Sequence, residues 1–177
     1  NPPNCGTNVE GIFGSACSFG LSGQNNYMNV TNMSSISPAN DITVMAWVYT
    51  NEITGSAKTI TRKQNQYAIT HLNRFNWIIT TLGSTTTVQS SLISVNTWYH
   101  VAGTYDGANM RLYLNGFQSG TSAKTGSMTD NLTNLMIGLG VGESLPMIGS
   151  IDEIAIFNRT LSASEIADIY KRGVLRL

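Results

Sequence analysis

Acidic side chains and histidines are the groups in this sequence that could carry out catalysis. Asp152 and Glu153 are adjacent acids in a strand-like segment, so on a regular strand they point to opposite faces. A glycosidase instead needs two carboxyl groups that flank one bond. His71 and His100 lie in no Ser or Cys motif that would complete a triad. The sequence therefore predicts that the chain is not an enzyme.

The two histidines carry different expectations. His100 lies inside the segment Trp98–Tyr105, and we expect a structural histidine that is hydrogen-bonded to a local partner. His71 lies near the tip of an expected hairpin, so we expect it to be exposed, where it could contact a ligand.

Asp152 is the most informative acid because it shares strand parity with Ile154 and Ile156. Those isoleucines favour the core for this side of the strand, where a carboxylate is costly unless it is paired or hydrogen-bonded. Backbone N–H groups from the turn between Gly23 and Asn26 are one solution. A calcium ion, which takes carboxylate and carbonyl oxygens, is the other.

Tyr67, His71, Arg74 and Trp77 gather around one expected hairpin. Aromatic rings stack on sugar faces and have polar neighbours in such sites, so these four residues are the candidate ligand-binding patch. The competing and favoured interpretation is that Tyr67 and Trp77 belong to the core. Trp47 and Trp98 lie in the strongest strand patterns and are also expected in the core.

Cys5 and Cys17 lie in one Gly-rich stretch. Their pairing would close a short loop, worth about 3 kcal/mol in the chain-entropy model, and would indicate an oxidising compartment. The alternative is two reduced thiols. Two cysteines with no nearby histidine do not make a zinc site.

Composition excludes several partners. The chain has 177 residues, of which 11% are charged, and its ten basic and ten acidic residues cancel. Because no basic stripe is present, we expect no binding to nucleic acid. No apolar run reaches the length of a membrane span, so we expect no membrane insertion by this segment.

Short alternating runs recur along the chain and predict strands. The segment 42–49 is apolar at both parities, which predicts a central strand covered on both faces. Asn73-Arg74 separates two runs that predict a hairpin. The strands are expected at 42–49, 67–72, 75–80, 85–93, 98–105, 110–114, 135–139 and 151–157.

One helix is expected from Leu161 to Tyr170. Ser162 and Glu165 form a capping box, and Gly173 is expected to end the helix in a left-handed turn. The elements predict one all-β domain over 1–177, with a linker-like start at 1–10 and a tail at 171–177.

Two longer segments resemble a known family. Residues 98–116, WYHVAGTYDGANMRLYLNG, are similar to the central signature of laminin G-like jelly-roll domains in the concanavalin A-like lectin/glucanase group. Residues 148–166, IGSIDEIAIFNRTLSASEI, resemble that family's closing strand and the start of its helix. A weaker match covers 14–27. The resemblance implies a two-sheet antiparallel jelly-roll sandwich with one short C-terminal helix.

The resemblance also bears on sites. It implies that Asp152 helps to hold a structural Ca²⁺ against the first turn, where Asn25 is the expected partner because the family's usual Asp is missing. The Glu-x-Asp-x-x-Glu strand of glycosidases with this fold is absent. The family's earlier strand with a Trp or Phe does not precede Cys5, which leaves an open sheet edge available for self-association.

Together these patterns predict a non-catalytic, secreted or cell-surface module that binds a glycan or a surface protein. The alternative is a structural subunit of a surface filament, layer or particle. A glycoside hydrolase is the remote third possibility, since it would need a dyad from residues distant in sequence.

Overall fold

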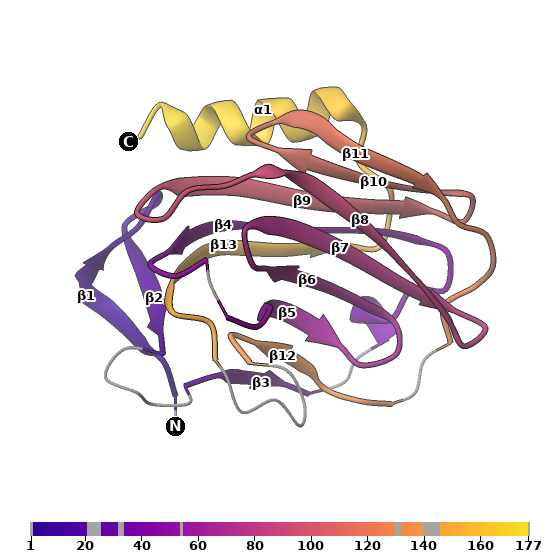
Figure 1. Ribbon diagram of the computed structural model, residues 1–177, viewed down its shortest axis with the longest axis horizontal. Coiled ribbons are helices and arrows are strands. Elements are labelled where there is room, and N and C mark those ends of the chain that lie inside the picture. Colours follow the sequence, from indigo (N-terminus) through magenta and orange to yellow (C-terminus); the bar gives the residue numbers. More distant parts are fainter. Residues whose placement is uncertain are drawn as a thin grey trace.

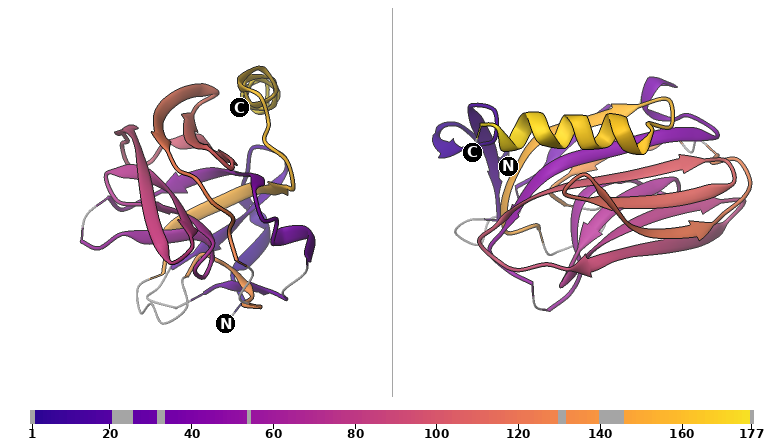
Figure 2. Two further views of the ribbon diagram at one scale, coloured as in Figure 1. Left: turned by 90° about the vertical axis from the view of Figure 1, so that its right-hand side faces the viewer. Right: turned by 90° about the horizontal axis from the view of Figure 1, so that it is seen from above.

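The computed structural model describes residues 2–20, 26–31, 34–53, 55–129, 132–139 and 146–176, without the side chains of residues 6–8. Its strands form two antiparallel sheets that lie face to face (Figure 1; Figure 2, left). One helix lies near the C-terminal end. The predicted all-β jelly-roll sandwich with a short helix is confirmed.

The larger sheet has seven strands in the order β1-β2-β13-β4-β9-β10-β11. These strands are β1 (Asn4–Glu10), β2 (Ser15–Phe19), β13 (Gly149–Phe157), β4 (Asp41–Thr50), β9 (Trp98–Asp106), β10 (Asn109–Leu114) and β11 (Phe117–Ala123).

The smaller sheet has six strands in the order β3-β12-β5-β6-β7-β8. They are β3 (Met28–Val30), β12 (Leu135–Ile137), β5 (Lys58–Lys63), β6 (Tyr67–His71), β7 (Arg74–Thr81) and β8 (Ser84–Leu92). A short 3-10 helix, Ser34–Ile36, precedes β4.

Side-chain alternation places the core between the sheets. On β7, Phe75, Trp77 and Ile79 are buried while the residues between them are only partly covered, as expected for a strand with one core face. Strand β4 is instead buried at nearly every position. Val44 and Val48 join the main core, whereas Met45 belongs to a second cluster on the outer face. The prediction that this strand is covered on both faces is confirmed.

One side of the sandwich is closed where the edges of β8 and β11 meet. The Ser91 N–H donates to Ser119 Oγ at 2.9 Å across this junction. A Cβ at Gly120 would lie 2.6 Å from the Gln89 carbonyl oxygen, so a residue with a side chain would force these strands apart. The sheets' remaining edges are β1 and β3, on the opposite side.

Helix α1 (Ala163–Val174) lies over the outer face of the seven-stranded sheet (Figure 2, right). Its N-terminus has the predicted capping box between Ser162 and Glu165. Gly173 does not end the helix, contrary to expectation, because the helix continues to Val174 and caps at Leu175 in a right-handed conformation. Gly173 instead lets the helix approach Trp47, since a Cβ there would lie 2.4 Å from Trp47 Cζ2.

The N-terminal residues are more ordered than predicted. Residues 4–10, expected to be linker-like, form the edge strand β1, and the predicted Cys5–Cys17 disulfide joins β1 to β2. The expected tail at 171–177 is also partly wrong, because α1 runs to Val174. In the described part of the chain, no helix has the length and hydrophobicity needed to span a membrane.

Candidate functional site

A row of side chains crosses the outer face of the seven-stranded sheet beyond the C-terminal end of α1. Paired residues on neighbouring strands point to the same face, so strand register alone brings them together. From the edge inward the row contains Asn4, Ser18, Ser150, Tyr49 and Trp98.

A surface hollow of about 480 Å³ lies over this row, and we call it the Tyr49–Trp98 site. The two rings lie 5.6 Å apart between centroids at an interplanar angle of 53°, and both are half-buried. Val9 and the exposed Glu10 complete the wall on the β1 side. The site therefore combines a partly exposed aromatic pair with hydroxyl, amide and carboxylate groups.

This mixture suits a ligand with alternating apolar faces and hydroxyl groups. Aromatic rings offer large apolar faces for stacking. Hydroxyl and amide groups such as those of Ser150 and Asn4 can both donate and accept hydrogen bonds, and the Glu10 carboxylate accepts them. The arrangement can bind such a ligand, and among the described residues Glu10 is the one carboxyl group that lines the hollow.

The residues predicted as a ligand patch do not form one. Tyr67 and Trp77 are buried between the sheets, where the Tyr67 hydroxyl donates to the Ile36 carbonyl and Trp77 Nε1 donates to the Thr104 carbonyl. Arg74 is half-buried and donates to the Ser90 carbonyl. The alternative interpretation, in which the two rings are core, is the one that the structure shows.

His71 is also buried rather than exposed. Its Nδ1 lies 3.4 Å from the Leu72 carbonyl oxygen, and its ring faces Phe75. Burial lowers the pKa of His71 to about 4. This side chain is therefore a neutral core residue at pH 7.

His100 is buried as expected, but the expected hydrogen bond is missing. Among the described residues, neither ring nitrogen has a hydrogen-bond partner. Burial lowers the pKa of His100 to about 4, so the ring is neutral at pH 7. It lies on the outer face of the sheet beside Trp47, with 5.4 Å between ring centroids.

Asp152 is buried, but on the outer face rather than on the face of Ile154 and Ile156. A β-bulge between Asp152 and Ala155, where Glu153 adopts φ 49°, shifts the parity of the strand. Asp152 consequently pairs with Trp47, while Ile154 and Ile156 pack against the main core. The parity prediction was wrong because a bulge has no clear signal in the sequence.

The Asp152 carboxylate is satisfied by backbone N–H groups, but from a different turn. Its Oδ2 accepts from Ile12 N at 2.7 Å and Phe13 N at 3.1 Å, and Oδ1 accepts from Glu153 N at 2.9 Å. A Cβ at Gly11 would lie 2.5 Å from Oδ2, so this turn closes tightly on the carboxylate. Asp152 thus anchors the β1–β2 turn to the sheet.

The predicted calcium site stays a prediction. Its second residue, Asn25, lies outside the described residues, as does most of the turn around it. Within the described ranges, no group of three or more His, Cys, Asp or Glu side chains could hold a metal ion. Asp152 could supply one oxygen ligand to such a site.

The Tyr49–Trp98 site was missed in the sequence, and the expectation that Trp98 belongs to the core was wrong, because Trp98 is half-buried on the outer face of the sheet. Tyr49 and Trp98 lie in segments that are apolar at both parities, so no alternation marks the outward side of either segment. Their pairing appears only once the register of β4 and β9 is known. An aromatic residue at the end of each strand was the one available signal.

The two packed antiparallel sheets form a jelly-roll sandwich, and the hollow on its surface is of the size that takes a small ligand. Residues 22–167 match the family described as the concanavalin A-like lectin/glucanases superfamily, in its laminin G-like group. The match covers most of the chain, which therefore belongs to this superfamily. No curated protein sequence matches the chain.

Solved structures share this fold at low sequence identity. The binding domain of Paraclostridial Mosquitocidal Protein 1 has a TM-score of 0.80 and 17% identity over 96% of this chain and 45% of that one. The botulinum neurotoxin serotype G binding domain gives 0.75 and 15% over 97% and 45%. The chain thus spans less than half of these toxin binding domains.

A third similar structure is matched over most of its length. It is domain 4 of AbnA, a GH43 extracellular arabinanase from Geobacillus stearothermophilus, in complex with arabinotriose. The TM-score is 0.74 at 18% identity, over 96% of this chain and 82% of that one. Two of these three structures are named as binding domains, so the fold of this chain is one that binding domains use.

Proposed function

We propose that this chain is a non-catalytic recognition module of a secreted or cell-surface protein, and that it binds a glycan at the Tyr49–Trp98 site. The observation that carries the proposal is the half-buried aromatic pair in a hollow with polar side chains around it. Sugar rings offer apolar faces for the indole and phenol rings, and their hydroxyl groups match the surrounding donors and acceptors.

Two further observations support this proposal. The Cys5–Cys17 disulfide is typical of proteins that fold in an oxidising compartment. The superfamily includes lectins, and the similar AbnA domain was solved with an arabinose oligosaccharide. A protein ligand is the competing partner, and the experiment below separates the two.

The test is binding of the purified chain to a glycan array that includes arabino-oligosaccharides, followed by calorimetric titration of the best binder. Trp98→Ala should weaken that binding at least about tenfold, which corresponds to about 1.4 kcal/mol of lost stacking. Tyr49→Phe keeps the ring and should have a smaller effect.

Asn76→Ala is the matched control, because Asn76 is a part-buried amide on the outer face of the other sheet, where it bonds Thr70 and Gln89. It should leave affinity unchanged. No binding to any glycan, or full binding by a folded Trp98→Ala variant, would contradict the proposal. Loss of binding in Asn76→Ala alone would place the ligand on the six-stranded sheet instead.

A further inference from the structure

A second hollow of about 440 Å³ lies between α1 and the outer face of the seven-stranded sheet, and we call it the helix groove. Its lining shares no residue with the Tyr49–Trp98 site. The walls are mainly apolar and aromatic, with contributions from the sheet, the helix and the β1–β2 turn. The residues that matter here are Phe13, Met45, Trp47, His100, Phe157 and Ile169.

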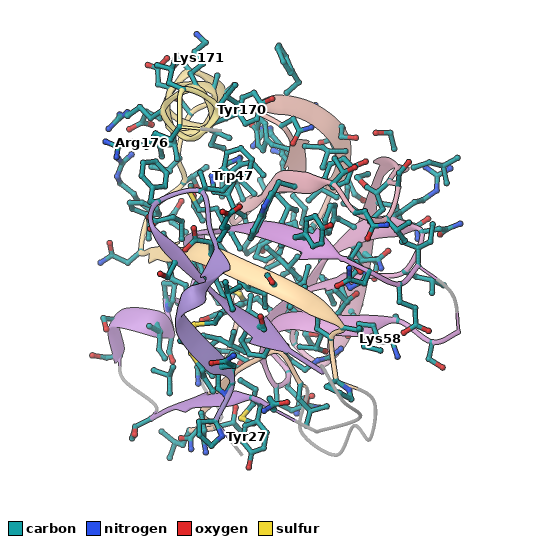
Figure 3. The ribbon with its side chains drawn as sticks, turned by 90° about the vertical axis from the view of Figure 1, so that its left-hand side faces the viewer. Tyr27, Trp47, Lys58, Tyr170, Lys171 and Arg176 are labelled. Carbon is teal, nitrogen blue, oxygen red and sulfur yellow. A yellow bond between two sulfur atoms is a disulfide. The ribbon has the colours of Figure 1, made fainter. Side chains whose placement is uncertain are left out.

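The aromatic walls of the helix groove are held in place. The Trp47 and Tyr170 rings stack between sheet and helix with centroids 5.6 Å apart and an interplanar angle of 24° (Figure 3). Gly173 packs directly against the Trp47 ring. The Arg176 guanidinium lies 4.9 Å from the centre of the Phe13 ring, and the turn that carries Phe13 is bonded to Asp152.

His100 is the unexplained polar group of this groove. The residue is only 1% exposed, yet in the described part of the chain neither ring nitrogen has a hydrogen-bond partner. A neutral imidazole offers one N–H donor and one acceptor. Leaving such buried groups unpaired is unfavourable, so they are normally bonded to protein, water or ligand.

The charges of the groove limit what it can hold. Glu153 and Arg172 are both exposed, so they lie at its mouth and remain hydrated. Inside it, none of the described lining residues is ionised at pH 7, because burial keeps His100 neutral. An ionised ligand group would be desolvated there without a partner.

We propose that the helix groove binds a small uncharged molecule with a flat apolar ring and one hydroxyl group, and that the His100 ring turns toward the groove so that one of its two nitrogens, both of which are shielded from the surface, bonds the hydroxyl. The ring packs against Trp47, Phe157 and Phe13. The hydroxyl can donate to the acceptor nitrogen of His100 or accept from its N–H, so it pairs one of the two groups that His100 leaves unpaired. This ligand class does not depend on glycan binding at the other site.

Phenol and toluene are the probes, because they have the same ring and differ in the hydroxyl. Each is titrated into the full chain labelled with ¹⁵N-histidine, and the imidazole resonances are followed. Phenol should bind saturably, shift the His100 nitrogens and leave those of His71 in place. Toluene should bind about fivefold more weakly, since it lacks the hydrogen bond.

His100→Phe removes both ring nitrogens and should equalise the two probes. His71→Phe is the matched control, because His71 is equally buried but lies beside Phe75 in the main core, and it should keep the preference for phenol. If His100→Phe does not fold, the wild-type resonances decide. Non-saturable shifts, shifts at both histidines, equal affinity for both probes, or a preference retained in His100→Phe would each overturn the proposal.

Discussion

Two buried histidines make this protein sensitive to acid. The pKa values of His71 and His100 are lowered from 6.5 to about 4 by burial, so the unfolded chain binds protons more readily than the folded one between those values. Stability should therefore be complete above pH 6.5 and fall as pH drops toward 4, by up to about 3 kcal/mol for each histidine.

Urea unfolding at pH 7, 5.5 and 4 measures this loss. His100→Phe should have a shallower dependence of unfolding free energy on pH than the wild type, because one of the two groups no longer titrates. An identical pH slope in the variant would show that His100 is already solvated in the folded protein.

Asp152 stabilises a turn that is far from it in the sequence, because it accepts hydrogen bonds from Ile12 and Phe13. Asp152→Ala leaves the N–H groups of Ile12 and Phe13 without their acceptor, so we expect about 1–3 kcal/mol of destabilisation. A thermal melt compares it with Asp168→Ala, an exposed helix position that should change stability little.

The same melts test the calcium prediction. If Asp152 and Asn25 hold a calcium ion, EDTA lowers the Tm of the wild type and leaves that of Asp152→Ala unchanged. A wild-type Tm that is indifferent to EDTA would leave the backbone N–H groups as the complete explanation of this buried carboxylate.

At the scale of elements, α1 is held to the sheet by an unusually close contact. Gly173→Ala would gain about 1 kcal/mol of helix propensity. The new Cβ would also lie 2.4 Å from Trp47 Cζ2, and such overpacking costs about 1–3 kcal/mol. We therefore expect net destabilisation together with altered Trp47 fluorescence, whereas Lys171→Ala on the exposed side should be neutral. A more stable Gly173→Ala would mean that the helix can shift freely.

Elements with their own apolar pattern were predictable from the sequence. Strands β4, β9 and β13, the β6–β7 hairpin and the helix cap all appear where alternation or capping residues indicated them. Strands β1, β2, β3, β5 and β11 were missed, because they are short or carry few large apolar side chains, so no apolar alternation marks them in the sequence. β1 contains one aliphatic residue, Val9, and depends on β2 and the disulfide.

The candidate sites were less predictable than the fold. The predicted patch relied on residues close in sequence, and tertiary packing turned Tyr67 and Trp77 inward. The two hollows combine residues far apart in sequence, such as Phe13 and Ile169 in the helix groove, and their shared position depends on register, a bulge and a glycine. None of these three features follows from local periodicity.

At the scale of the whole molecule, the sandwich has one closed side and one side where, in the described part of the chain, the sheets end in edge strands. The β8–β11 junction closes the first, while β1 and β3 end the sheets on the other. Self-association by strand pairing, the predicted alternative to ligand binding, should therefore involve β1 or β3. Light scattering over a range of concentrations tests this, and hydrogen exchange should then show added protection in β1 or β3. A monomer at millimolar concentration would contradict it.

The disulfide-closed hairpin β1–β2 lines both hollows, supplying Asn4, Val9 and Glu10 to one and Phe13 to the other. The disulfide joins its two strands, the Asp152 carboxylate holds its turn, and β2 pairs with β13, while most of the core lies elsewhere. The exposed residues between Cys5 and Cys17 are therefore positions that substitutions can change. Randomising its exposed positions in a display library, with Gly11 and the buried Ile12 and Ala16 retained, would vary the walls of both hollows at once.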